Sequence, residues 1–203
     1  MSVRAVCFDL LSALLDSWSL WDAVAAELGA GGLGRTWRQR YLALTSTAGA
    51  YRPYLDLVGE AAESAGLPPG AAARLEERWD TLRPWPDVGP ALASLHLPSA
   101  VVTNCSEVLG RRAVACVGAP FTVVATAEAA GAYKPDPAPY WLARQRLDVV
   151  PGEVAYVAGS PFDARGARLQ GFEVTWVNRL RAPVPADLGG ARIVETLAGW
   201  SPT

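Results

Sequence analysis

The first apolar stretch of the chain reads VRAVCFDLLSALLD and runs from Val3 to Asp16. Its first six residues are mostly β-branched, aromatic or small and apolar, which predicts a short buried strand over 3–8. One carboxylate, Asp9, directly follows that strand and lies inside an otherwise apolar run. A charged side chain in that position, at the end of a buried strand, is a candidate for function.

Strand and helix signals alternate through the second half of the 203 residues. Further strands are predicted at 100–103, 121–124, 154–157 and 173–177. Helices are predicted at 89–95, up to about 117, at 137–147 and at 162–169. Strands that alternate with helices of this length predict an α/β fold built on a doubly wound parallel sheet.

The segment 17–83 is different, because it has helical periodicity and no strand signal. Helices are predicted at 17–28, 36–48, 54–65 and 71–82, with Ser17 and Thr36 as the N-caps of the first two. The rigid break Pro84-Trp85-Pro86-Asp87 ends this segment. We therefore expect two domains, a core of residues 1–16 and 84–203 and a helical cap of residues 17–83.

Composition excludes several classes of function. The net charge is −2 and the arginines are scattered, so nucleic acid is not an expected partner. The sequence has no uninterrupted apolar run of ~18 residues, so no membrane span is predicted. The three cysteines form no paired motif and indicate reduced thiols, so a cytoplasmic location is expected. The single histidine, His96, precedes Leu97-Pro98 and argues against a serine–histidine triad or a histidine-based metal site.

Polar residues follow four of the predicted strands, where parallel sheets bind ligands. They are Asp9 after the first strand, Thr103 and Asn104 at the second, Lys134 in the loop after the third, and Ser160 with Asp163 after the fourth. One such residue is more often a cap or a turn former. A set with one member in each β–α unit is harder to explain in that way.

The ordered set resembles the haloacid dehalogenase superfamily over nearly the whole chain. The matching pieces are Phe8-Asp9-Leu10, Val102-Thr103-Asn104, Tyr133-Lys134-Pro135-Asp136-Pro137 and Asp163. Three further segments are similar to the L-2-haloacid dehalogenase branch: Trp37-Arg38-Gln39, the spacing from Lys134 to Tyr140, and Phe162-Asp163-Ala164-Arg165-Gly166. The resemblance implies a Rossmann-like core with an α-helical cap inserted after the first strand, a small carboxylate as substrate, and a possible homodimer.

The resemblance also implies a role for each residue. Asp9 is the expected nucleophile, Lys134 keeps it ionised, and Asp163 positions Lys134 and the hydrolytic water. Arg38 is expected to bind the substrate carboxylate or the leaving halide. The expected substrate-binding residues also include Leu10, Leu11, Thr103, Asn104, Tyr140 and Ser160, although a tyrosine on a helix can also simply pack against the sheet.

Position 11 separates the chemistries of the superfamily. Phosphatases carry a second aspartate there as general acid, whereas this chain has Leu11. The first carboxylate of the family normally helps to hold Mg²⁺ in a shell of oxygen atoms. Because Leu10 and Leu11 follow Asp9 here, we expect no cofactor and no catalytic metal. Other departures are Ala13, Ala158 and Ser160, where the family carries threonine, serine and asparagine. The leaving group could be a halide or a strained ring nitrogen, as in relatives that open azetidine carboxylate. A catalytically degenerate binding protein and, third, a Mg²⁺-dependent phosphatase remain alternatives.

Overall fold

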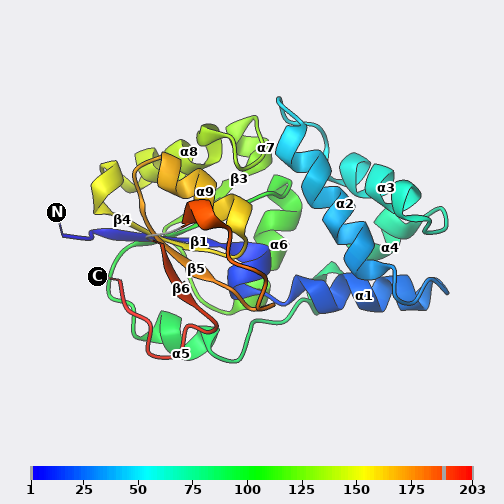
Figure 1. Ribbon diagram of the computed structural model, residues 1–203, viewed down its shortest axis with the longest axis horizontal. Helices are drawn as coiled ribbons and strands as arrows, with labels where there is room; N and C mark the ends of the chain where they lie inside the picture. The colour runs from blue at the N-terminus through cyan, green and yellow to red at the C-terminus, as the bar shows by residue number, and fades with distance from the viewer. Residues whose placement is uncertain (1, 189–190, 203) are drawn as a thin grey trace.

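The computed structural model describes residues 2–188 and 191–202 of the chain (Figure 1). At its centre, the described residues form one sheet of six strands in the order β3-β2-β1-β4-β5-β6, and every neighbouring pair is parallel. The α/β class and the doubly wound parallel sheet predicted from sequence are confirmed. The strands are β1 (Ala5–Asp9), β2 (Ser99–Thr103), β3 (Val123–Thr126), β4 (Val154–Ala158), β5 (Glu173–Val177) and β6 (Arg192–Val194).

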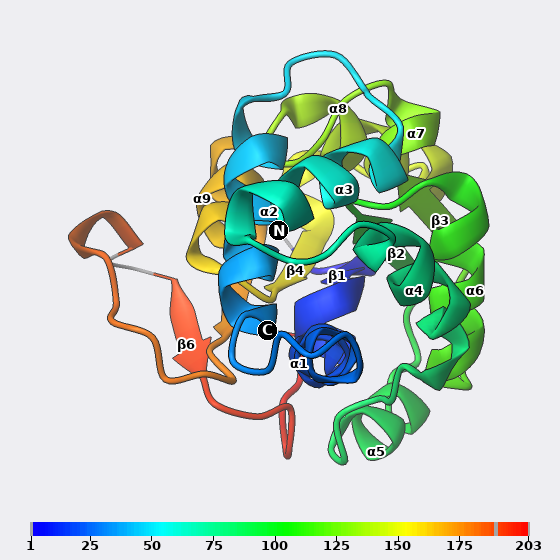
Figure 2. The same ribbon diagram turned by 90° about the vertical axis from the view of Figure 1, so that its right-hand side faces the viewer.

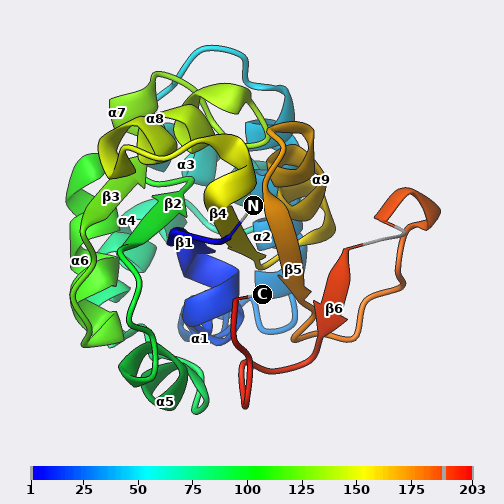
Figure 3. The same cartoon turned by 90° about the vertical axis from the view of Figure 1, so that its left-hand side faces the viewer.

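Helices cover both faces of the sheet, because each inner strand is apolar on both sides. The helices α8 (Pro137–Leu147) and α9 (Pro161–Leu169) lie on one face, above the sheet in Figure 1. Cys7 of β1 and Tyr156 of β4 point into that layer. The helices α5 (Val88–Ala93) and α6 (Glu107–Val117) lie on the other face, where Phe8 is part of the core. Figure 3 shows the sheet between the two layers.

Four helices and a 3₁₀ turn lie between β1 and β2 in the chain and at the carboxyl ends of the strands in space (Figure 2). They are α1 (Ser17–Glu27), α2 (Gly34–Thr47), α3 (Tyr54–Ala65), α4 (Ala71–Glu77) and η2 (Trp79–Thr81), here called the cap helices. Hydrogen bonds join the helices and the loops between them to the part of the chain that forms the sheet. The Tyr41 hydroxyl donates to Asn104 O at 2.7 Å, and Ala50 pairs with Ala132. Division at 17–83 into a separate domain stays a prediction.

The start of α1 corrects one predicted cap. Asp16, and not Ser17, is the N-cap, because its side chain accepts from the Ser19 amide at 3.1 Å. The Ser17 hydroxyl instead donates to Leu11 O inside the core. Thr36 is also not a cap, because α2 begins two residues earlier at Gly34 and its N-cap residue, Leu33, makes no capping bond through its side chain.

Other differences from the prediction arise where pairing or packing overrides the local pattern. The third strand covers 123–126 and not 121–124, because β2 pairs Ala100 with Val123. The last cap helix ends at Glu77 and gives way to η2. The elements η1 (Leu10–Leu14), α7 (Ala127–Ala130), η3 (Pro151–Glu153), η4 (Ala186–Leu188) and β6 were not predicted. Within the described parts of the chain, no helix is both long and apolar enough to cross a membrane.

Candidate active site

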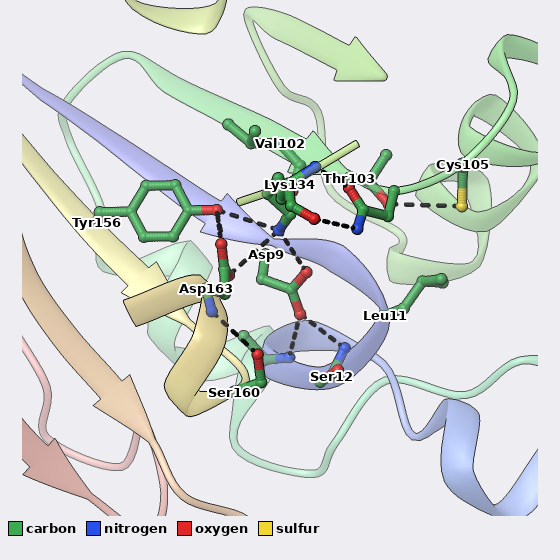
Figure 4. A network of polar contacts seen from close by, with 12 residues as sticks. Asp9, Leu11, Ser12, Val102, Thr103, Cys105, Lys134, Tyr156, Ser160 and Asp163 are labelled. Carbon is green, nitrogen blue, oxygen red and sulfur yellow. Dashed lines mark hydrogen bonds and ion pairs between the residues drawn. The ribbon is translucent and has the colours of Figure 1, made fainter. Parts of the chain in front are cut away.

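Asp9 is the last residue of β1, and the turn that follows it holds its carboxylate. The π-helix η1 directs the backbone amides of Ser12 and Ala13 back at Asp9. Both donate to Asp9 Oδ2, at 2.9 and 3.1 Å (Figure 4). Asp9 therefore caps η1, and this capping fixes the direction of its second oxygen, Oδ1. The side chain is buried.

Lys134 lies in the loop between α7 and α8, with its ammonium group between two carboxylates. Nζ is 2.9 Å from Asp9 Oδ1 and 3.1 Å from Asp163 Oδ2. It also donates to Val102 O at 2.8 Å and lies 3.2 Å from the Tyr156 hydroxyl. An ammonium group has three protons, and these four acceptors share them. Lys134 is thus placed to orient Asp9, with no N–H group left for a substrate.

Asp163 lies in the first turn of α9, on the other side of Lys134. Ser160 caps this helix by accepting from the Asp163 amide at 3.2 Å. The Tyr140 hydroxyl donates to Asp163 Oδ1 at 2.8 Å. The Tyr156 hydroxyl lies 3.0 Å from Oδ1 and 3.2 Å from Oδ2. One ammonium group and two phenols therefore hold this carboxylate in place.

Burial and charge act in opposite directions on the three ionisable groups. Burial alone would raise the pKa of Asp9, but Lys134 and the two backbone amides outweigh it, so the pKa lies below its usual value. Burial alone would lower the pKa of Lys134, but Asp163 and Asp9 together raise it. The pKa of Asp163 is raised, because burial and the charge of Asp9 outweigh Lys134. Asp9 is therefore the ionised partner of a protonated Lys134 near neutral pH.

Arg38 reaches the same site from α2. Its side chain is 2% exposed, and its guanidinium carbon lies 4.5 Å from the centre of the Trp18 ring. Nη2 donates to Ser12 Oγ at 3.1 Å, whereas Nε and Nη1 have no hydrogen-bond partner among the described residues. Burial lowers the pKa of Arg38, and the groups that oppose this include Asp9. A buried cation with unsatisfied N–H groups is unfavourable until an anion completes it.

These groups line one cavity of about 60 Å³. That volume holds about four to six water-sized spheres, which suits a small acid. Eight of the ten predicted site residues line it: Asp9, Leu11, Arg38, Thr103, Asn104, Lys134, Ser160 and Asp163. The other lining residues are Ser12, Tyr41, Leu42, Thr45, Ser46, Pro135 and Phe162.

Two predicted substrate contacts, Leu10 and Tyr140, lie outside the cavity, and a third, Asn104, lines it with its side-chain amide already bonded. Leu10 is fully buried and does not line the cavity, because it faces the core beneath η1. Tyr140 is also fully buried and stands behind Asp163, where its hydroxyl is bonded. Asn104 lines the cavity, but its side chain accepts from the Lys134 amide at 2.7 Å and donates to Lys134 O at 3.1 Å. Its amide group therefore holds the backbone of the lysine loop.

Sequence reasoning missed Tyr156, Ser12 and Tyr41. From the sequence, Tyr156 was assigned only to a strand. Its hydroxyl could have indicated more, because a phenol in an apolar strand needs a buried hydrogen-bond partner. Ser12 was not among the predicted site residues, yet its amide donates to Asp9 and its hydroxyl accepts from Arg38. Tyr41 lines the cavity and joins α2 to Asn104. That contact joins residues 63 positions apart, so no local pattern reveals it.

Contacts from distant parts of the chain brace the turn that holds Asp9. Arg179 donates to Ala13 O at 2.8 Å and forms an ion pair with Asp87 at 2.7 Å. On the other side, Gly159 lies so close that a Cβ atom there would be 2.5 Å from Asp9 Oδ2 and 2.6 Å from Ala13 N. A side chain at position 159 would therefore have to displace the carboxylate or the turn.

The chain is similar to known hydrolases over most of its length. The protein-family model for the haloacid dehalogenase-like hydrolases matches residues 3–171. An (S)-2-haloacid dehalogenase from Xanthobacter autotrophicus is 31% identical over 192 residues, which cover 88% of this chain and 76% of that one. (S)-2-haloacid dehalogenase 2 from Pseudomonas sp. (strain CBS-3) is 32% identical over 199 residues, covering 88% and 85%.

Solved structures give the same result. The structure of L-2-haloacid dehalogenase from Xanthobacter autotrophicus with chloropropionic acid covalently bound matches with a TM-score of 0.84 at 26% identity. The match covers 96% of this chain and 95% of that one. Because the family model and the relatives cover most of the chain, it belongs to the haloacid dehalogenase-like hydrolases, in the L-2-haloacid dehalogenase branch.

Proposed function

We propose that this chain hydrolyses a small 2-substituted carboxylic acid without a metal ion, with Asp9 as the nucleophile and a 2-haloacid as the substrate type. The observation that carries the proposal is the pairing of two features in one cavity. Asp9 is held ionised by Lys134 at 2.9 Å, and two guanidinium nitrogens of Arg38 have no hydrogen-bond partner among the described residues. A nucleophilic anion and an unsatisfied cation in the same small cavity suit a substrate that carries its own negative charge.

In the first step, Asp9 attacks C2 of the substrate. A bond forms between the carboxylate oxygen and C2, and the bond from C2 to the leaving group breaks with inversion at C2. A halide leaving group departs as an anion and takes no proton. Arg38 binds the substrate carboxylate or the departing anion, because its charge is poorly compensated within the protein. The product of this step is an aspartyl ester.

In the second step, water attacks Cγ of the ester. Asp163 positions that water together with Lys134. A bond forms between Cγ and the water oxygen, the bond from Cγ to the ester oxygen that attacked C2 breaks, and the 2-hydroxy acid and a proton are released. Negative charge develops on the acyl oxygen during the attack. If that oxygen occupies the position of Oδ2, the amides of Ser12 and Ala13 already donate to it and form an oxyanion hole.

A magnesium-dependent phosphatase fits these residues poorly. Leu11 lines the cavity in place of the acid that a phosphate ester needs to protonate its leaving alkoxide. The group nearest Asp9 Oδ1 is a cation, Lys134, and not a further oxygen ligand. No group of three histidine, cysteine, aspartate or glutamate side chains suitable for a metal ion lies within the described residues. The donor set therefore does not suit Mg²⁺.

A binding protein without catalytic activity is the second candidate. Ala13 and Ala158 favour it, because each is fully buried and brings no hydroxyl to the site. A strictly degenerate site, however, gains nothing from keeping a buried Asp9–Lys134–Asp163 cluster, since desolvation makes such a cluster unfavourable without a use. A homodimer and a cytoplasmic location stay predictions.

The decisive experiment is a single turnover in H₂¹⁸O. Excess enzyme is mixed with 2-chloropropionate, 2-bromopropionate, chloroacetate or azetidine-2-carboxylate, and the peptide that contains Asp9 is analysed by mass spectrometry. The proposal expects one ¹⁸O atom in Asp9 and none in the product of the first turnover. Label in the product with none in Asp9 would show direct attack by water and contradict the ester intermediate.

Two variants and one addition complete the test. Asp9→Asn is expected to abolish labelling and turnover, while Asp56→Asn, at an exposed position on α3, is expected to retain both. Addition of EDTA is expected to leave the rate unchanged. Binding of the acids without turnover of any of them would favour the degenerate protein, and Mg²⁺-dependent release of phosphate from a phosphate ester would favour the phosphatase.

A further inference from the structure

We propose that Tyr156 is a positioning residue of this active site, whose hydroxyl joins Lys134 to Asp163 and replaces the hydroxyl that position 158 lacks. The proposal rests on the proposed function of Asp9, Lys134 and Asp163. Tyr156 does not line the cavity, so it acts through these two neighbours and not on the substrate itself.

The environment of the Tyr156 hydroxyl determines the direction of its hydrogen bonds. The side chain is fully buried, and burial together with the charge of Asp163 keeps the pKa of its phenol well above the usual value. The phenol therefore stays neutral and has one proton. Lys134 can only donate, so the Tyr156 oxygen accepts from Nζ and its own proton goes to Asp163. The chain of bonds runs in one direction from cation to anion.

The ring of Tyr156 is as firmly held as its hydroxyl. It stacks on Phe172, with the ring centres 6.0 Å apart, and meets the edge of Tyr140 at 5.5 Å. Cys7 is its neighbour across the β1–β4 pair, two residues before Asp9. A rigid ring on a central strand places a hydroxyl more precisely than a flexible chain could.

Strand geometry connects Tyr156 with Ala158. Side chains two residues apart on β4 point to the same face of the sheet, and both residues belong to the layer beneath α8 and α9. Ala158 is fully buried and has no polar atom to offer Lys134 or Asp163. Because tyrosine is longer, Tyr156 delivers a hydroxyl toward that end of the strand from one pleat further back.

The hydroxyl has a use in both chemical steps. Before attack, it accepts one of the Lys134 protons and so helps to aim the ammonium group at Asp9. Once Asp9 becomes an uncharged ester, Lys134 loses one of its two charged partners. Asp163 and Tyr156 then hold the cation in place while water enters. Loss of the hydroxyl removes a donor from Asp163, so the pKa of Asp163 rises further.

The first test is Tyr156→Phe, which removes only the hydroxyl. With the haloacid that the enzyme turns over best, we expect kcat to fall about 10- to 100-fold, the range for loss of a hydrogen bond to a charged group. KM is expected to stay within about twofold. In the pH profile of kcat, the acidic limb is expected to move to higher pH, because the pKa of Asp163 rises. Tyr54→Phe is the matched control, because the Tyr54 hydroxyl is buried without a partner among the described residues.

A rescue variant separates positioning from packing. Ala158→Ser in the Tyr156→Phe background returns a hydroxyl to the same face of β4, and we expect it to recover at least about fivefold in kcat. Unchanged kcat and an unchanged pH profile in Tyr156→Phe would overturn the proposal. A fall in kcat without a shift of the acidic limb would also overturn it, since that indicates packing alone. No recovery in the double variant would overturn the replacement of the missing hydroxyl at position 158.

A measurement without substrate keeps this inference apart from the proposed function. In protein labelled with ¹³C at the aspartate carboxyl carbons, the Asp163 signal is identified by its loss in Asp163→Asn. We expect its titration to move to higher pH in Tyr156→Phe and to stay unchanged in Tyr54→Phe. An unmoved titration contradicts the role of Tyr156 even if the enzyme is active, and a moved one supports it even if every haloacid fails.

Discussion

Replacing Arg38 by methionine is expected to leave the free protein stable and to weaken its stabilisation by carboxylates. Methionine keeps most of the length of the side chain and removes its charge. Nε and Nη1, the two nitrogens without a partner among the described residues, each cost about 1–3 kcal/mol when buried, so their removal returns about 2–6 kcal/mol. The bond to Ser12 contributes about 1.5–3 kcal/mol, and the contact with Trp18 contributes about 0.5–2 kcal/mol. The terms nearly cancel, so the free energy of unfolding is expected to change by about 1 kcal/mol or less.

The response to an unreactive carboxylate should differ far more. Propionate at 100 times its dissociation constant stabilises the wild-type protein by about 2.7 kcal/mol if it binds only the folded state. Loss of about 2 kcal/mol of charge-assisted binding weakens its affinity about 30-fold. At the same concentration, stabilisation of Arg38→Met then falls to about 0.9 kcal/mol.

The assay is urea unfolding at pH 7 and constant ionic strength, with and without propionate. Arg40→Met on the same helix is the control, because Arg40 is exposed and lies outside the cavity. Equal stabilisation of wild type and Arg38→Met by propionate would refute the role of Arg38 in binding. Destabilisation of the free variant by about 3 kcal/mol or more would refute the view that Arg38 is held in an unsatisfied state.

Three further predictions concern the support of Asp9. In Gly159→Ala, the new Cβ must displace Asp9 or its turn. We therefore expect activity to fall more than about 100-fold and the free energy of unfolding to fall by about 1–3 kcal/mol. Gly89→Ala is the control, because the space around Gly89 is open, and it is expected to keep its activity and its stability. In Lys134→Met, the pKa of Asp9 is expected to rise above its ordinary value, so the folded variant binds a proton more tightly than the unfolded chain and gains stability as pH falls. Urea unfolding should therefore show a larger deficit against wild type at pH 8 than at pH 5, and equal deficits would contradict this reading. For the buried ion pair, Asp87→Asn and Arg179→Gln are each expected to cost about 3–5 kcal/mol, and the double variant less than their sum in a double-mutant cycle.

The elements that could be predicted from sequence are those whose cause is local. An apolar run of five residues in the middle of a parallel sheet is nearly all buried, so β1, β2, β4 and β5 were predicted within two residues at each end. Helices α3 and α8 were predicted with the bounds that the structure has. By contrast, β6 has two exposed residues among three and was not predicted, because its pairing with β5 depends on a distant segment.

The same distinction applies to the site. Asp9, Lys134 and Asp163 follow strands, and the carboxyl ends of parallel strands meet at one edge, so the topology alone brings them together. Tyr140 and the side-chain amide of Asn104 lie in this region, but their bonds to Asp163 and to the backbone of Lys134 were not predicted. Which partner a hydrogen-bonding side chain chooses depends on distances of a few tenths of an ångström between distant segments, and no periodicity carries that information.

The central position of β1 has a consequence for how the protein is made. The strand that ends in Asp9 pairs with β2 on one side and with β4 on the other, and β4 begins 145 residues after Asp9. At a synthesis rate of about 5–20 residues per second, β4 emerges roughly 7–30 s after β1. Until then one edge of an almost wholly apolar strand has no native partner. Such non-local pairing slows folding, so the strand that carries the proposed nucleophile is also exposed to mispairing during translation.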